Sequence, residues 1–365
     1  MVEAIEVELQ SVSKFYGEDK VVDAVSLHVN QGEIFVLIGP SGCGKTTTLK
    51  MINQLIPHTS GRILVRGKDV TELDPVELRR SIGYVIQYIG LLPHLTIRDN
   101  ITFVLQLKKY NKKMQRERAM ELIETVGLPV SYLDRHPREL SGGQQQRVGV
   151  ARALAADPEI LLMDEPFGAV DPITREQLQL ELLRLQETIK KTIIFVTHDM
   201  QEAFKVGDRI GIMRGGRLVT IGTAMDIVRE RDEFIRNFIG QGAIFSALDT
   251  IPAARAIIDD LPIVQEGAAL DDDVLSLTGD WENIFIVDGQ RRCLGYISLS
   301  EIKGQRKIDR EKVTACPPPC RPGDSLKKVI EEMLWGNRAW LPVVSEEGYF
   351  LGIVSFQSCA SLLVG

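Results

Sequence analysis

The chain has 365 residues, of which 44% are apolar and 25% are charged, values close to the average for folded soluble proteins. This composition argues against a disordered or fibrous chain, and the length predicts two domains or one large one. The net charge of −7 comes from 43 basic and 50 acidic side chains and argues weakly against a general nucleic-acid binder. Residues 1–243 carry 31 basic and 32 acidic side chains, whereas residues 244–365 carry 12 and 18, so the excess negative charge lies mostly in the last third.

No apolar run approaches the roughly 18 residues that cross a bilayer, and the first ten residues are acidic where a signal peptide would be basic. We therefore expect a chain that stays in the cytoplasm. The cysteines form no C-x-x-C pair, and Cys316-Pro-Pro-Pro-Cys320 has no nearby His that would complete a zinc site. We expect all five to be free thiols in a reducing compartment: Cys43, Cys293, Cys316, Cys320 and Cys359.

Strand patterns alternate with helix patterns over the first 240 residues. Two β-rich segments, 5–9 and 21–29, predict edge strands, and the continuous apolar run 34–38 predicts a strand buried on both faces. Similar strand-then-helix patterns recur at 160–163 and 192–197, which is typical of a parallel sheet covered by helices.

Residues 105–140 have helical periodicity and predict a mostly helical insert. Beyond it, glycines at Gly240-Gln-Gly242 indicate a linker, so we place a domain boundary between residues 243 and 244.

The last third contains an internal repeat with an offset of 57 residues, which is found by aligning Gly295 with Gly352. Ile284-Phe-Ile-Val then aligns with Leu341-Pro-Val-Val, and the residues around each glycine also match. Both copies have the pattern of a strand, a polar turn and a strand. A chance match of two short hairpins is the alternative.

A glycine-rich loop follows the apolar run 34–38. It matches G-x-x-x-x-G-K-[ST] and lies between a buried strand and a helix that begins near Lys45. The backbone N–H groups of such a loop surround phosphate oxygens, and the helix N-terminus adds partial positive charge. Lys45 can reach the β- and γ-phosphates, and the Thr46 hydroxyl suits a magnesium ion. The expected phosphate-binding residues are Gly39, Pro40, Ser41, Gly42, Cys43, Gly44, Lys45, Thr46 and Thr47.

Two carboxylates end the apolar segment Ile160-Leu-Leu-Met-Asp164-Glu165-Pro166. Its four apolar residues predict a central strand, which in a phosphate-loop fold lies beside the loop. Asp164 can then hold magnesium through a water, and Glu165 can accept a proton from the attacking water. Purely structural carboxylates are the alternative.

A second glycine pair stands in Leu140-Ser141-Gly142-Gly143-Gln144, just before a helix-like segment at 145–156. Ser141 as an N-cap is the simple interpretation. Two glycines at a helix N-terminus also predict a second anion site in the same chain.

These three motifs together resemble those of the ATP-binding subunits of ABC transporters, over residues 1 to about 240. The resemblance implies a P-loop NTPase fold of the α/β class, with a mostly parallel sheet, an antiparallel β subdomain and a helical subdomain at about 88–158. ATP and Mg²⁺ are the implied cofactors. In this family two ATP-binding domains pack head to tail, so a second copy of the chain is the implied partner. The residues that would contact ATP held by the other copy are Ser141, Gly142, Gly143 and Gln144.

Four further positions match the family one by one, and an ordinary structural role is the alternative for each. Tyr16 matches the aromatic residue that stacks on adenine, and Gln87 matches the glutamine that contacts magnesium and the attacking water. Asp171 matches the loop that crosses the dimer contact, although Val170 before it departs from the usual Leu. His198 matches the histidine that contacts the γ-phosphate. The resemblance implies as catalytic residues Lys45, Gln87, Glu165 and His198, and as metal ligands Thr46, Gln87 and Asp164.

Residues 87–104 are rich in Leu, Ile and aromatic side chains, and in this family the segment receives a short helix from the membrane subunit. Core packing is the alternative. The C-terminal repeat resembles a tandem pair of CBS (cystathionine-β-synthase-type) motifs, an α+β domain with copies at about 250–305 and 313–365. Its first copy carries the charged run Asp271-Asp-Asp273 where a helix is expected.

An ABC ATPase followed by this pair resembles the subunits of bacterial importers for glycine betaine, choline, carnitine and proline betaine. The resemblance implies transmembrane permease subunits, a substrate-binding protein reached through the complex, and a peripheral position at the cytoplasmic face of the inner membrane. An amino-acid importer and a non-transport ABC ATPase acting on nucleic acid are the alternatives, and we expect no nucleic-acid partner.

The signal read by the C-terminal pair stays open between two alternatives. CBS pairs that bind adenosine nucleotides carry an Asp where this chain has Glu301 and Ser358, and a nucleotide at the pair is the first alternative. The acidic tail could instead respond to ionic strength, because attraction between charged surfaces weakens as salt shortens the Debye length.

Overall fold

The computed structural model describes residues 4–87, 90–168, 170–268, 281–302 and 312–364. The chain divides into two compact units, Met1–Ile227 and Val228–Gly365. The boundary therefore lies before the linker expected at 243/244, because helix α9 (Glu233–Asp249) runs through that position and packs on α12 (Leu326–Trp335) of the second unit. Gly240 still interrupts the helix, since its φ of 67° and ψ of 165° are not helical.

A six-stranded sheet forms the centre of the first unit, in the order β10-β9-β3-β8-β7-β6. Neighbouring strands are parallel except for β10, which runs antiparallel to β9. Every residue of β3, β7 and β8 is buried, as their continuous apolar runs predict. The mostly parallel sheet is confirmed. The strands are β3 (Ile34–Ile38), β6 (Ile82–Val85), β7 (Ile160–Asp164), β8 (Thr192–Thr197), β9 (Arg209–Arg214) and β10 (Arg217–Gly222).

The antiparallel subdomain is a four-stranded sheet in the order β2-β1-β4-β5. Both strands expected at its edge are present, but β1 lies inside the sheet, because it pairs with β4 as well as with β2. The strands are β1 (Ile5–Tyr16), β2 (Asp19–Asn30), β4 (Ser60–Val65) and β5 (Lys68–Asp69).

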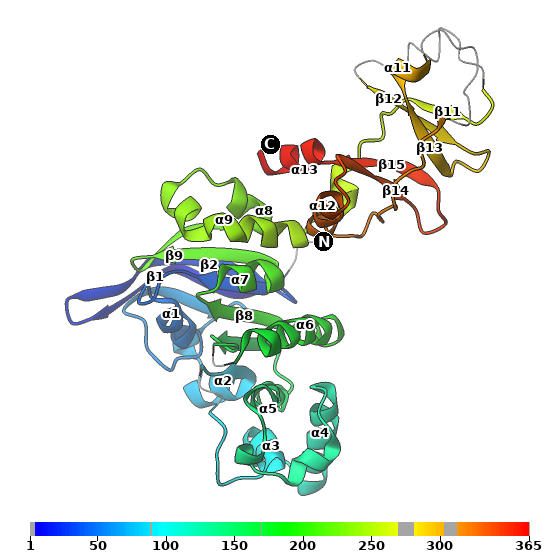
Figure 1. Cartoon of the computed structure of the whole chain (residues 1–365). Helices are drawn as coiled ribbons and strands as arrows, with labels where there is room; N and C mark the ends of the chain where they lie inside the picture. The colour runs from blue at the N-terminus through cyan, green and yellow to red at the C-terminus, as the bar shows by residue number, and fades with distance from the viewer. Residues whose placement is uncertain (1–3, 88–89, 169, 269–280, 303–311, 365) are drawn as a thin grey trace. The chain divides into compact units, whose positions relative to one another are not determined.

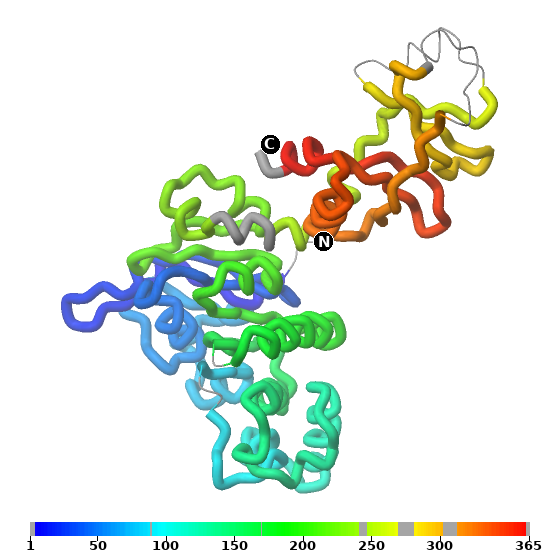
Figure 2. Tube along the Cα trace, in the orientation of Figure 1, coloured from blue at the N-terminus to red at the C-terminus, as the bar shows by residue number. Residues whose placement is uncertain are grey.

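The helical subdomain is confirmed as a cluster of three helices at one end of the first unit (Figures 1 and 2). Its helices begin at side-chain caps: the Thr96 side chain accepts from the Asp99 N–H, and the Asn111 side chain accepts from the Met114 N–H. The helices are α3 (Ile97–Leu107), α4 (Lys112–Thr125) and α5 (Gly142–Leu154), with the short 3₁₀ turns η2 (Val130–Asp134) and η3 (Pro137–Glu139).

Among the remaining helices of the first unit, α1, α2, α7 and η1 contact strands of the two sheets, α6 packs on α5 and α7, and α8 crosses the unit boundary. They are α1 (Lys45–Ile52), η1 (Val70–Glu72), α2 (Pro75–Ser81), α6 (Pro172–Ile189), α7 (Met200–Val206) and α8 (Ala224–Arg229). In the part of the chain that the structure describes, no helix is both long enough and apolar enough to span a membrane.

The second unit contains the repeated hairpin. Strands β12 (Asn283–Val287) and β13 (Cys293–Ser298) pair antiparallel, and β14 (Trp340–Val344) and β15 (Phe350–Ser355) do the same at positions 57 residues later. Each hairpin places its glycine opposite the fourth residue of the preceding strand and has an irregularity at the same step. The repeat is therefore a structural one. The other elements are η4 (Ala253–Ala256), β11 (Ile263–Gln265), α11 (Leu299–Ile302) and α13 (Phe356–Val364).

The two hairpins are joined by exchanged backbone pairing. Ile258, which precedes the first hairpin, pairs with Ile353 of β15, and Thr314, which precedes the second, pairs with Tyr296 of β13. Each crossing strand passes directly over the repeated glycine of the other copy, so a Cβ at that glycine would collide with a carbonyl oxygen. This crossing explains why both copies have glycine at this position.

A shared aromatic core holds the two copies together. The Phe285 ring lies 5.2 Å from the Trp340 ring in an edge-on arrangement and 5.6 Å from the Phe350 ring, measured between centroids.

The expectation of five free thiols is wrong at two positions, because Cys293 and Cys316 form a disulfide. The crossing strand at Thr314 lies beside β13 and so brings Cys316 next to Cys293 across 23 residues of sequence. Cys43, Cys320 and Cys359 are free and buried. The charged run Asp271–Asp273 lies outside the described residues.

Candidate active site

The glycine-rich loop connects β3 to α1, as its sequence predicts. Gly42 and Gly44 have φ values of 79° and 103°, a region that favours glycine. A side chain at Gly44 would also meet the carbonyl oxygen of Val21 at 2.6 Å. Lys45 is buried, and its Nζ donates to the carbonyl oxygens of Gly39 at 2.7 Å and Pro40 at 3.1 Å. The loop therefore holds the Lys45 ammonium group against its own carbonyl oxygens, directly where α1 begins.

Thr46 and Asp164 lie together, although 118 residues separate them in sequence. The Thr46 hydroxyl donates to Oδ1 of Asp164 at 2.8 Å, and the Tyr84 hydroxyl lies 3.4 Å from Oδ2. Burial raises the pKa of the Asp164 carboxyl, and burial together with the Asp164 charge raises the pKa of Tyr84. A buried carboxylate beside a hydroxyl is an oxygen-rich set of the kind that Mg²⁺ prefers.

Within the described ranges, no group of three or more His, Cys, Asp or Glu side chains could hold a metal ion. The donors expected here are one carboxylate, one hydroxyl and the Gln87 amide. The Thr46 hydroxyl contacts Asp164, whereas the Gln87 amide donates to Glu165. Mg²⁺ usually keeps several waters and takes further ligands from substrate phosphates, so such a set fits it.

Two further side chains, those of Gln87 and His198, converge on one carboxylate oxygen of Glu165. Nε2 of Gln87 donates to Oε2 of Glu165 at 2.9 Å, and Nδ1 of His198 lies 3.2 Å from the same oxygen. These residues follow the ends of β6, β7 and β8, which are neighbours in the sheet, so parallel pairing brings them to one edge. Glu165 has a φ of 45°, in the left-handed region, and its N–H donates to the carbonyl of Val196 at 2.9 Å. The backbone thus holds this carboxylate in an unfavourable conformation at the sheet edge.

The second glycine pair lies at the start of α5, where Ser141 is the N-cap. The Gln144 N–H donates to Oγ of Ser141, and the Ser141 N–H donates to Oε1 of Gln144, a reciprocal capping box. The simple interpretation of Ser141 is therefore correct, while Ser141 and Gly142 remain exposed to solvent. Gly143 packs closely on α6, since a Cβ there would meet Cγ2 of Thr174 at 2.6 Å.

Asp171 is the N-cap of α6 and accepts a hydrogen bond from the Thr174 N–H at 3.1 Å. Hydrogen bonds with Thr174 lower the pKa of Asp171. Tyr16, at the end of β1, is 48% exposed, with Nζ of Lys14 4.9 Å from its ring centroid. The ring is thus open to solvent, as an aromatic platform for a base must be. Ala169, within the same expected dimer loop as Asp171, lies outside the described residues, as do Tyr88 and Ile89.

Sequence reasoning missed a group of residues behind the edge of the sheet. Arg175 donates to the carbonyl of Val170 at 3.3 Å and lies 3.6 Å from Asp199, the residue after His198. Tyr84, which contacts Asp164, was also missed. Tyr84 stands three residues before Gln87 on the same segment, and this position was the sequence feature that could have identified it. No sequence feature pointed to Arg175.

Two parts of the chain match known protein families. Residues 22–168 match the family model described as ABC transporter, and residues 311–365 match the CBS domain model. The chain is 42% identical to the glycine betaine/carnitine/choline transport ATP-binding protein OpuCA of Bacillus subtilis, over 97% of this chain and 95% of that protein. The chain belongs to the ATP-binding proteins of ABC transporters.

Other members of this ABC family have similar lengths and names. The choline transport ATP-binding protein OpuBA of Bacillus subtilis is 43% identical over 97% of this chain and 95% of that protein. The osmoprotectant import ATP-binding protein OsmV of Salmonella typhimurium is 42% identical over 94% and 91%.

Among solved structures, the ABC cassette MJ0796, a dimer in a post-hydrolysis state with ADP and phosphate bound, is 37% identical. The match covers 60% of this chain and 98% of that one, with a TM-score of 0.54. As an ABC ATPase, this chain therefore binds ATP through the cassette of its first unit. The CBS model covers only the second copy, so the first copy is identified by the repeat itself.

Proposed function

We propose that this ABC ATPase powers an importer for a quaternary-amine osmoprotectant: glycine betaine, choline, carnitine or proline betaine. The observation that carries the proposal is similarity along almost the whole chain, cassette and tail together, to proteins named for these solutes. An amino-acid importer is the second candidate. The cassette alone would support either importer equally well, so the ranking depends on the match that includes the tail.

In the proposed site, the Lys45 side chain and the backbone N–H groups of the loop 39–47, in which Pro40 has none, bind the ATP phosphates, and Tyr16 stacks on the adenine. Glu165 is the general base for the attacking water. Gln87 and His198 contact the Glu165 carboxylate and orient that water. Thr46, Gln87 and Asp164 would hold Mg²⁺, which would neutralise charge on the phosphates when bound.

A second copy of the chain completes this site. One chain has one phosphate loop and one Ser141–Gln144 segment, and the exposed cap of α5 is free to approach the γ-phosphate held by another copy. The dimeric state of the solved cassette supports this arrangement. Asp171, at the start of α6, is proposed to lie in the dimer contact.

The permease is proposed to dock on the segment 90–104, at the membrane's cytoplasmic face. Asn100 is fully buried and fixes the preceding loop, because its side chain donates to the carbonyls of Leu92 and Thr96 and accepts from the Leu92 N–H. Pro93 and His94 remain exposed on this loop. Core packing therefore accounts for α3, while the loop itself is available to a partner.

Uptake by the reconstituted complex tests the function. The chain, its permease and its binding protein are placed in vesicles, and uptake and ATP hydrolysis are measured with the four quaternary amines and with histidine as an amino-acid control. At least one quaternary amine should stimulate both. Stimulation by the amino acid alone, or co-purification with nucleic acid in place of a permease, would refute the proposal.

We further propose that the second unit regulates transport in response to ionic strength. Ser358, at the position where nucleotide-binding CBS copies carry Asp, uses its hydroxyl locally, since it accepts from the Ser355 N–H and donates to the Ser355 carbonyl. This engagement favours ionic strength over a ribose as the signal.

A truncation tests the regulatory role. Because α9 packs on α12, with Asp249 accepting from the Ser325 hydroxyl at 2.9 Å, the deletion must begin at residue 228 and not within α9. Transport by chains ending at residue 227 should lose its dependence on salt between about 0.05 and 0.5 M, where the Debye length falls below about 10 Å. An unchanged salt dependence would show that the tail is not the sensor.

A further inference from the structure

A pocket of about 520 Å³ lies in the first unit, between the helical subdomain and the central sheet, and it opens to solvent beside the exposed lining residues Arg184 and Thr188. Its walls come from the end of α4, the middle of α5, the end of β7 with the segment that follows it, and α6 from Leu178 onward. Most lining side chains are apolar, including Val126, Met163, Phe167 and Leu182, and these four are buried. This size and lining are typical of a site for a small organic molecule.

The wall has hydrogen-bond donors without acceptors. Gln146 lines the cavity and is 2% exposed, yet its Nε2 has no partner among the described residues. The neighbouring Arg147 directs Nη2 to Glu181 at 2.6 Å, but its buried Nε is also unpartnered. A buried unpaired donor costs on the order of 1–3 kcal/mol, so a ligand that supplies an acceptor would recover part of that cost. No lining residue has an unpartnered buried acceptor in the described chain.

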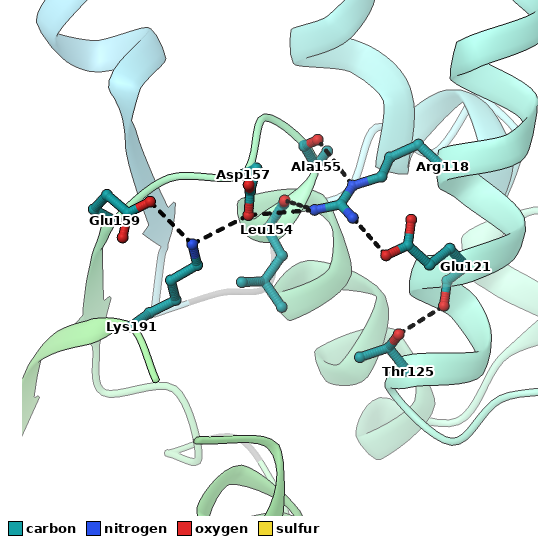
Figure 3. Close-up of polar contacts among 8 residues, drawn as sticks. All are labelled: Arg118, Glu121, Thr125, Leu154, Ala155, Asp157, Glu159 and Lys191. Carbon is teal, nitrogen blue, oxygen red and sulfur yellow. Dashed lines mark hydrogen bonds and ion pairs between the residues drawn. The ribbon is translucent and has the colours of Figure 1, made fainter. Parts of the chain in front are cut away.

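A polar network anchors the α4 wall to the core (Figure 3). Arg118 of α4 donates to the carbonyl of Leu154 at the end of α5, and it lies 3.7 Å from Asp157. Asp157 also lies 3.1 Å from Nζ of Lys191, the residue just before β8. Thr125, which lines the cavity, donates to the carbonyl of Glu121 on the same helix. The α4 wall is therefore held in place by contacts outside the cavity, and the space does not depend on an occupant.

We propose that this cavity binds a small amphiphilic carboxylate, with an apolar body among the aliphatic side chains and an acceptor oxygen on Gln146 and Arg147. The charge of the wall agrees with this class, because Arg147 and Arg184 outnumber the one acidic lining residue, Glu181. A cationic amphiphile would leave the donors unpaired, and glycine betaine has no apolar body to fill the space. An occupant would contact both α5, whose N-cap is Ser141, and the segment that follows Glu165.

Calorimetric titration of the full chain with octanoate tests the proposal. Octanoate should bind at least about tenfold more tightly than octylamine, the difference expected when an acceptor of roughly 1.4 kcal/mol is replaced by a donor. Glycine betaine should not bind the same site. Equal affinity for octanoate and octylamine, or no octanoate binding, would overturn the proposal.

Two variants and one control variant locate the site. Leu185→Trp places a larger side chain at a lining position and should weaken octanoate binding at least about tenfold, whereas Leu180→Trp, on the exposed face of the same helix, should leave it unchanged. Gln146→Leu keeps the shape and removes a donor, so it should weaken octanoate but not octanol. The comparison of octanoate with octanol is made within Gln146→Leu, so it remains informative if Leu185→Trp fails to fold. Unchanged octanoate affinity in Gln146→Leu would refute the assigned contact.

Discussion

Replacing Glu165 with Gln removes the proposed general base and keeps the shape of the side chain. Oε2 of Glu165 receives the Gln87 amide at 2.9 Å and lies 3.2 Å from Nδ1 of His198, and an amide oxygen can still accept from either group. The loop that binds phosphate is not involved, because Lys45 and Thr46 make their contacts with Gly39, Pro40 and Asp164. The substitution should therefore affect turnover and leave ATP binding almost intact.

The magnitude follows from the role of a general base. Positioned bases contribute about 10² to 10⁴ in rate, which corresponds to roughly 3 to 5.5 kcal/mol in the activation free energy. We expect steady-state hydrolysis by Glu165→Gln to fall by at least about 10². ATP affinity, measured with a fluorescent analogue, should change by less than about threefold, and the variant should form an ATP-dependent dimer in size-exclusion chromatography.

The matched control is Glu159→Gln, the same substitution just before the opposite end of β7. Glu159 is partly exposed and lies 3.2 Å from Nζ of Lys191, an ion pair of the kind that contributes about 0–1 kcal/mol. Its hydrolysis rate should stay within about twofold of the unmodified chain. Hydrolysis by Glu165→Gln within about threefold of the unmodified rate would refute the assignment of the base.

Two further predictions concern the fold. Gly295→Ala and Gly352→Ala should each destabilise the second unit by about 1–3 kcal/mol, because the crossing strands leave no room for a Cβ. The control Gly289→Ala has open space around the added Cβ and should not destabilise the unit. Proteolysis rates of the unit under native conditions measure the difference. Asp69 has a pKa lowered to about 2 by its hydrogen bonds with Thr71, so its contribution to stability is complete above pH 4 and is lost as the pH falls toward 2. Hydrogen exchange should accordingly show that the Thr71 amide, which donates to Asp69, loses protection over that pH range, and constant protection would contradict the prediction.

The sequence predicted the parts of the site that depend on local patterns. The glycine loop, its preceding buried strand and the helix at Lys45 form a contiguous motif, so their positions could be read directly. The roles of Gln87, Glu165 and His198 were implied only by the family resemblance, and the structure adds that they follow three neighbouring parallel strands and so meet at one edge. The roles of these residues stay predictions, since geometry alone does not measure catalysis.

Features that depend on distant contacts were beyond the sequence patterns. The inner position of β1 follows from its pairing with β4, about 50 residues later. The walls of the cavity come from four separated segments that no single pattern connects. The boundary at 227/228 depends on α9 packing against α12, a contact between residues about 90 positions apart.

The exchanged pairing also determines how the acidic tail must be treated. Each copy of the repeat completes the other, since Ile258 pairs with β15 and Thr314 pairs with β13, so neither hairpin can be removed without leaving the other unpaired. The added segment 228–243 carries three basic and three acidic side chains, so moving the boundary leaves the charge of the second unit at −6. The negative charge is therefore a property of one cooperative unit. An ionic-strength response, if it arises from this charge, must be lost as a whole on truncation at residue 227 and cannot be assigned to one copy.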